Sequence, residues 1–158
     1  GKLQAAHQGL ATTLMCQPNQ VGALLAKLDG VNALTDVTGF GFAGHLIEMC
    51  RGGSLSAIID PAAIPELPGL GDYITQGCVP GGTQRNFDAL RDGLPTLASR
   101  ELAVLCDPQT SGGLLVAVSP SAVEDVQQLL TEQELASTVV GSFIANENGE
   151  SAIDLQAG

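Results

Sequence analysis

VNALTDVTGFGFAGHLIEMCRGGSLSAIID, residues 31–60, is the stretch that decides the fold. It predicts three successive elements: a strand at 31–38, a helix at 42–51 and a strand at 54–60. The helix is indicated by apolar side chains that recur on one face: Phe42, Leu46, Ile47 and Cys50. Gly52-Gly53 predicts its end, because glycine is the favoured residue just beyond a helix. The stretch is therefore a strand–helix–strand unit.

The second half of the chain predicts the same order of elements. A strand at 114–118 (LLVAV) is followed by a helix at 121–135 and strands at 138–145 and 151–155. Asn148-Gly149 predicts a hairpin turn between the last two strands. The helix could begin with a capping box of Ser121 and Glu124, or with Ser119 followed by Pro120.

The remaining segments join these units. Residues 61–82 are rich in proline and glycine, and predict a loop with at most one short helix near 71–76. Helices are predicted at 21–28, with Val21, Leu24, Leu25 and Leu28 on one face, and at 84–93. Two strand–helix–strand units indicate an α+β sandwich with a mixed sheet.

Composition limits the classes of protein. The 158 residues are 44% hydrophobic and 15% charged, which indicates one globular domain over residues 1–158. Six Lys and Arg against 17 Asp and Glu give a net charge of −11, which disfavours binding to nucleic acid and to anionic membranes. No apolar run approaches the ~20 residues of a membrane span, and no signal peptide is visible. Four cysteines without a CxxC motif predict free thiols in a reducing compartment, so we expect a cytoplasmic protein.

The first of three glycine-rich clusters is DVTGFGFAG, residues 36–44. Its GxGxxG spacing, with Asp60 16 residues after Gly44, fits a dinucleotide site. Asp36 argues for a different ligand, because a carboxylate would repel a bare phosphate at the start of a helix. Mg²⁺ between the carboxylate and a phosphate removes that conflict. A plain strand-to-helix turn with Asp36 as a cap is the third reading.

The other two clusters are GGTQRN, residues 81–86, and DPQTSGG, residues 107–113. Backbone N–H groups, the Thr83 hydroxyl and the Arg85 guanidinium could cradle an oxyanion, or could belong to a loop before a capped helix. In the DPQTSGG cluster, the glycines just before the 114–118 strand would let another backbone approach closely, although a plain turn has the same composition. We expect all three clusters to share one solvent-facing edge. His45 is expected to be a structural histidine rather than a ligand.

TDVTGFGFAGHLIEM, PGGTQRNF and LCDPQTSGGLLVAV occur in this order. Together they resemble the carboxy-terminal half of the selenophosphate synthetase (selenide, water dikinase) family, from about Leu10 to the end of the chain. The larger group includes aminoimidazole ribonucleotide synthetase, thiamine-monophosphate kinase and a hydrogenase maturation protein. The resemblance implies a three-layer α/β/α domain that is partly ferredoxin-like. It also implies that an amino-terminal ATP-binding and catalytic domain is missing from this chain.

The family reaction converts selenide, ATP and water into selenophosphate, AMP and phosphate, with Mg²⁺ between the domains. The resemblance implies that Asp36 reaches this metal, and that the Cys or selenocysteine nucleophile lies in the absent domain, so no catalytic residue is expected here. Eight further residues match the motifs and are candidates for binding ATP: Thr38, Gly39, Gly41, Thr83, Arg85, Asn86, Gln109 and Thr110.

The resemblance implies a homodimer for the intact protein, built through the absent domain. We expect this chain alone to be an inactive monomer. Two alternatives stay open. One is the equivalent domain of a thiamine-monophosphate kinase or hydrogenase maturation protein, and the other is a non-catalytic anion-binding or scaffold module.

Overall fold

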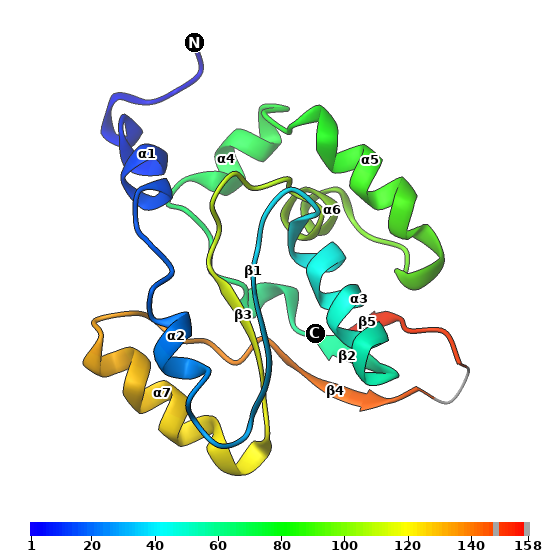
Figure 1. The fold of residues 1–158 in the computed structure, drawn as a ribbon. Helices are drawn as coiled ribbons and strands as arrows, with labels where there is room; N and C mark the ends of the chain where they lie inside the picture. The colour runs from blue at the N-terminus through cyan, green and yellow to red at the C-terminus, as the bar shows by residue number, and fades with distance from the viewer. Residues whose placement is uncertain (147–148, 157–158) are drawn as a thin grey trace.

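The computed structural model describes residues 1–146 and 149–156 (Figure 1). Its strands are β1 (Val31–Asp36), β2 (Leu55–Ile59), β3 (Leu114–Val118), β4 (Gly141–Ala145) and β5 (Ile153–Leu155). Its α-helices are α1 (Leu10–Met15), α2 (Gly22–Leu25), α3 (Gly41–Gly53), α4 (Leu70–Thr75), α5 (Gly81–Leu90), α6 (Ser99–Leu105) and α7 (Val123–Glu132). Four short 3₁₀ turns are η1 (Ala5–His7), η2 (Pro61–Ala63), η3 (Arg91–Gly93) and η4 (Pro120–Ala122).

The strands form two sheets. In the first, β1 pairs with β3 antiparallel, and the register ends with Asp36 opposite Leu114. In the second, β2 lies between β4, to which it is antiparallel, and β5, to which it is parallel. The α+β class with a mixed sheet is thus confirmed, with the mixed pairing in the three-stranded sheet.

The predicted hairpin between the last two strands is wrong, because β2 lies between β4 and β5. Asn148-Gly149 indicates a turn between neighbouring segments, but it cannot indicate that β2, from earlier in the chain, pairs between the two strands. Burial explains the arrangement, since the parallel pairing places Ile153, 1% exposed, beside Ala57 in the core. Of the two residues predicted for the turn, Asn148 lies outside the described residues.

The sheet β1–β3 is the middle of three layers. On one face, Leu114, Val116 and Val118 of β3 pack into a small core with Val21 and Leu25 of the α2 segment and Val126 of α7. On the other face, Leu115 joins a larger core built on α3. The alternation of β3 side chains thus covers both faces, which agrees with the expected α/β/α arrangement.

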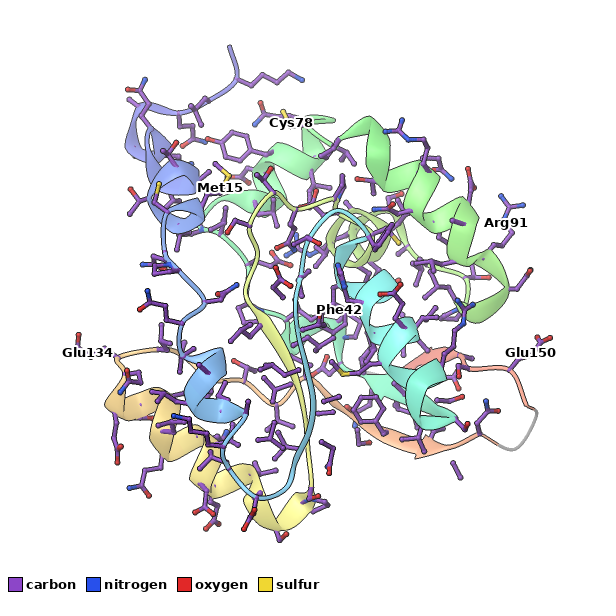
Figure 2. All side chains as sticks on the ribbon, viewed as in Figure 1. Met15, Phe42, Cys78, Arg91, Glu134 and Glu150 are labelled. Carbon is purple, nitrogen blue, oxygen red and sulfur yellow. The ribbon has the colours of Figure 1, made fainter. Side chains whose placement is uncertain are left out.

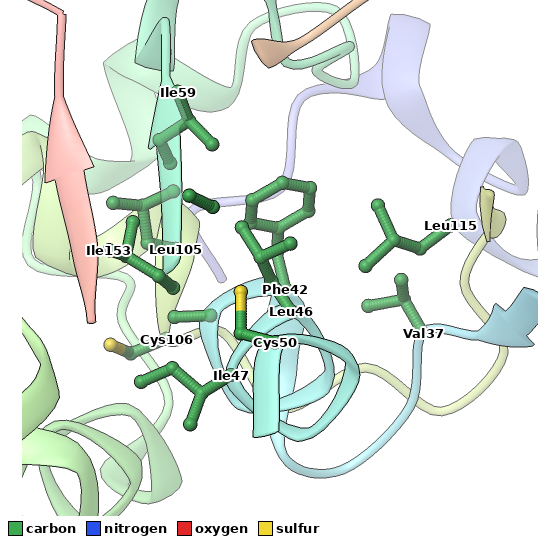
Figure 3. Close-up of a cluster of buried hydrophobic side chains, with 12 residues drawn as sticks. Val37, Phe42, Leu46, Ile47, Cys50, Ile59, Leu105, Cys106, Leu115 and Ile153 are labelled. Carbon is green, nitrogen blue, oxygen red and sulfur yellow. The ribbon is translucent and has the colours of Figure 1, made fainter. Parts of the chain in front are cut away.

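The larger core joins α3 to both sheets (Figures 2 and 3). All four apolar residues predicted for one helix face are buried, and Figure 2 shows Phe42 in the interior of the molecule. They pack with Leu105 and Cys106 and with Ile59 and Ile153 from the mixed sheet, as Figure 3 shows. The prediction of this helix face is confirmed.

Several predicted boundaries were wrong. Helix α3 includes Gly52 and ends at Gly53, and the residue that follows, Ser54, takes a left-handed conformation (φ 54°). The second-half helix is preceded by a 3₁₀ turn that starts at Pro120, and no side-chain cap is formed there. Leu24 is 39% exposed, because α2 has a single turn and presents Leu25 to the small core.

Candidate functional site

The three glycine-rich clusters meet beyond the end of β1. We call residues 36–41 the Asp36 loop and residues 107–113 the DPQTSGG loop. Val37 N–H donates to Gly113 O (2.9 Å) and Gly112 N–H donates to Val37 O (3.0 Å), so the pairing of β1 with β3 extends into both loops. Gln109 N–H donates to Thr38 O at 3.1 Å. These bonds fix the two loops to each other along their backbones.

Asn86 on α5 adds the third cluster. Its Nδ2 donates to Gly39 O (2.9 Å) and to Cys106 O (3.0 Å), and so ties α5 to both the Asp36 loop and the start of the DPQTSGG loop. Each cluster keeps at least one exposed residue: Asp36, Arg85 and Thr110. The part of the expectation that brings the three clusters together is confirmed, and a shared solvent-facing edge for their side chains stays a prediction.

Glycine is required where these segments touch. Gly41 has φ +72°, and a Cβ there would lie 2.9 Å from the backbone oxygen of Asp107. A Cβ on Gly82 would lie 2.8 Å from the ring of Pro108. Both distances are shorter than van der Waals contact. A side chain at Gly41 would therefore push the Asp36 loop away from the DPQTSGG loop, and a side chain at Gly82 would push α5 away from it.

Asp36 is exposed at the last position of β1. Within residues 1–146 and 149–156, its carboxylate is in no ion pair or side-chain hydrogen bond that would occupy it. The same residues contain no group of three or more His, Cys, Asp or Glu side chains that could hold a metal ion. Asp36 therefore offers an exposed carboxylate at the end of β1, which fits one ligand of a Mg²⁺ whose remaining ligands come from elsewhere.

Arg85 and Thr83 have opposite environments. Arg85 is exposed, and its guanidinium lies close to the glycines at the start of α5. A Cβ added to Gly82 would be 3.5 Å from Arg85 Nη2. No ion pair of the described residues involves this guanidinium. Thr83 is 1% exposed, and its hydroxyl has no hydrogen-bond partner among the described residues.

Two residues that were not predicted to bind a ligand also lie at this site. Asp107 is half-buried between the clusters, and burial raises the pKa of its carboxyl above the ordinary 3.8. His45, expected to be structural, is 8% exposed and contacts Thr38 of the Asp36 loop through Nε2. The burial of Asp107 and the contact of His45 with Thr38 both depend on how the segments pack, so no spacing of residues in the sequence indicated them.

The dinucleotide reading of the first cluster is wrong. That site needs neighbouring parallel strands on either side of the glycine turn, whereas β1 and β2 lie in different sheets. Gly41 is packed against the backbone of Cys106 and Asp107, so it is not free to approach a pyrophosphate. Asp60 caps η2 by accepting from Ala62 N–H at 2.9 Å.

Comparison with known proteins identifies the family to which the chain belongs. The family described as "AIR synthase related protein, C-terminal domain" matches residues 4–154, and the chain belongs to this family. Of the helices that the structure describes, none is long and apolar enough to cross a membrane.

The similar curated proteins share one name, which is more specific than the family description. The chain is 52% identical over 142 residues to "Selenide, water dikinase" of Shewanella sp. (strain ANA-3), covering 90% of this chain and 40% of that protein. It is 46% identical over 156 residues to the protein of the same name from Haemophilus influenzae (strain 86-028NP), covering 99% of this chain and 45% of that protein. The chain thus spans less than half the length of these relatives.

Proposed function

We propose that this chain is the carboxy-terminal domain of an enzyme that makes selenophosphate from selenide, ATP and water, with AMP and phosphate as co-products. The observation that carries the proposal is the meeting of the three glycine-rich clusters beyond the strand that ends at Asp36, whose exposed carboxylate is in no ion pair among the described residues. The names of the similar proteins, at about half identity over most of the chain, support the choice of reaction.

The residues divide by exposure into two roles. Asp36, Gly39, Arg85 and Thr110 are exposed and would face the triphosphate of ATP. The others are buried or half-buried and would hold the loops in shape: Thr38, Gly41, Thr83, Asn86 and Gln109. Asn86 illustrates the second role, because both of its recorded bonds go to backbone carbonyls.

Charge explains why this domain would supply one side of the site. A net charge of −11 opposes binding of a polyphosphate, and Arg85 is the single cation within the three clusters. Asp36 would provide one oxygen ligand to Mg²⁺, which when bound neutralises phosphate charge during phosphoryl transfer. We propose that the amino-terminal part of the intact protein supplies the nucleophile, the other metal ligands and most ATP contacts. This chain alone would then be an inactive monomer, and the intact protein a homodimer.

The alternatives are weaker. A thiamine-monophosphate kinase or hydrogenase maturation domain belongs to the same larger group. However, the motifs GGTQRN and DPQTSGG are intact in this chain, and the similar proteins carry the dikinase name. A non-catalytic anion-binding or scaffold module would have no use for the exposed Asp36 carboxylate, which is in no ion pair among the described residues and would repel an anion.

The substitution Asp36→Asn in the intact protein tests the proposal. Asparagine keeps the shape and loses the charge, so ATP-dependent selenophosphate formation should fall about 10²–10³-fold, as for loss of a group that stabilises transition-state charge. The melting temperature should change little, because Asp36 is exposed. Asp125→Asn removes the same charge from the exposed side of α7 and should leave turnover unchanged. Near-normal turnover of Asp36→Asn with a large drop in melting temperature would make Asp36 a structural cap and refute the assignment.

A further inference from the structure

His45 contacts the loop that carries Asp36 through a bond whose direction is unambiguous. Thr38 N–H donates to His45 Nε2 at 3.0 Å, and the Thr38 hydroxyl lies 3.2 Å from the same nitrogen. A backbone N–H is always a donor, so the nitrogen that it meets must carry a lone pair. The tautomer therefore follows from the backbone and not from an assignment of hydrogens.

We propose that His45 is a positioning residue: a neutral imidazole, protonated on Nδ1, whose Nε2 accepts from Thr38 and holds the Asp36 loop in place. The consequence for activity rests on the proposed function. The tautomer and the hold on the loop do not, because they follow from this chain's own contacts.

The rest of the imidazole agrees with this state. With Nε2 as the acceptor, the single proton of the neutral ring is on Nδ1, which lies 3.8 Å from Glu48 Oε2. That distance is too long for a hydrogen bond, and the Glu48 side chain is 62% exposed. The ring of Phe40 is tilted beside it at 5.7 Å between centroids. The recorded contacts thus hold the ring through Thr38 rather than through the glutamate.

Thr38 passes this constraint to the other loop. Its N–H is held by His45 on α3, and its carbonyl oxygen accepts from Gln109 N–H of the DPQTSGG loop at 3.1 Å. The peptide groups on both sides of Thr38 are therefore fixed, two residues after Asp36. Asn86 holds Gly39 O from the α5 side. The Asp36 loop is thus clamped by one side chain from each of two helices.

Three substitutions separate positioning from mere packing. His45→Gln places an amide oxygen near the position of Nε2 and can still accept from Thr38. His45→Asn is one carbon shorter and does not reach it. His45→Leu fills the space without any acceptor and leaves the half-buried Thr38 N–H unpaired.

Nuclear magnetic resonance of this chain gives the first test. Long-range proton–nitrogen spectra at neutral pH should show His45 with an unprotonated Nε2 and a protonated Nδ1. The chain has two histidines, so His7→Asn leaves one ring signal and assigns it. A protonated Nε2, as the other tautomer or as imidazolium, would overturn the proposal whatever the substitutions do.

Hydrogen exchange of the Thr38 amide gives the second test. His45→Leu and His45→Asn should speed its exchange about tenfold or more relative to amides of β3, while His45→Gln should keep it within about twofold. Equal protection in the Leu and Gln variants would show that packing alone holds the loop. If the Leu variant does not fold, the Asn and Gln pair makes the same comparison.

Turnover of the intact protein links the inference to function. We expect kcat to fall in the Leu and Asn variants and to recover in the Gln variant. Recovery of Thr38 protection without recovery of turnover would overturn the positioning role. An intact wild-type protein that makes no selenophosphate would instead refute the proposed function and leave the two spectroscopic results standing.

Discussion

Asp107 is held where the three clusters meet, and its half-burial has a consequence for stability. Burial disfavours the charged carboxylate and raises the pKa of this group above its ordinary value. The folded protein then binds the proton more tightly than the unfolded chain, so stability from this group is present at low pH and is lost as the pH rises through the raised pKa.

We therefore expect Asp107→Asn to raise the melting temperature at pH 7, because the amide removes an ionised group from a half-buried place. The gain should shrink as the pH falls below the ordinary carboxyl value, where both proteins are uncharged at this position. Calorimetry at pH 3 and pH 7 measures the difference. A lower melting temperature at pH 7 would show that the ionised carboxylate has a favourable partner in the fold.

The four thiols should react as two pairs. Cys50 and Cys106 are 0% exposed, and burial raises the pKa of each thiol from 9.0 to about 11. Cys16 and Cys78 are exposed, and Figure 2 shows Cys78 at the edge of the molecule. A thiol-reactive chromophore at pH 8 should label two cysteines in the native protein and four in denaturant. Rapid labelling of all four in the native protein would contradict the core described above.

At the scale of elements, the contact of α3 with the DPQTSGG loop depends on a glycine. Gly41→Ala would force a side chain into the left-handed region and to 2.9 Å from the Asp107 oxygen. We expect a loss of at least about 1–2 kcal/mol, seen as a lower midpoint in urea unfolding. Gly39→Ala is the matched control, because a Cβ at Gly39 meets nothing within 4 Å. Equal midpoints for the two variants would mean that the loop relaxes without cost.

Elements with a strong local period were predictable, and contacts between distant elements were not. The apolar period of residues 42–51 predicted the buried face of α3, because that face is a property of the helix itself. The apolar run LAVLC at 102–106 is too short to indicate by its pattern that it belongs to a helix, α6. The β4–β5 hairpin was wrong because a turn signal does not report the insertion of β2.

The site was predictable to the same extent. Three clusters of glycine and polar residues indicated which segments would meet, and the resemblance to a known family supplied the candidate metal ligand. The bonds that hold the segments together join Asn86 to Gly39 and Thr38 to His45. Those bonds depend on how α3 and α5 pack against the loops, and the pattern of residues along the chain does not predict that packing.

At the scale of the molecule, two cores stabilise one arrangement of the loops. The small core lies between α2, α7 and the β1–β3 sheet, and the larger core lies between that sheet, α3 and the mixed sheet. Strand β3 contributes side chains to both cores, whereas β1 contributes Val31 and Leu34 to the small core and is followed by Val37 of the larger core. The two strands meet at the site, with Asp36 opposite Leu114. The position of the Asp36 carboxylate is therefore set by apolar packing on both faces of this sheet.

This arrangement predicts cooperative folding without ATP or metal, because apolar burial stabilises the fold and hydrogen bonds within the chain, not ligation, hold the loops. The described residues contain no cluster of three potential metal ligands, so chelation has nothing structural to remove. Thermal unfolding in excess EDTA should show one transition at the same temperature as in its absence. Leu25→Ala is the comparison: it removes a fully buried side chain from the small core and should destabilise the protein by about 2–5 kcal/mol. Loss of the folded baseline on chelation, with little effect of Leu25→Ala, would show instead that a metal ion organises the fold.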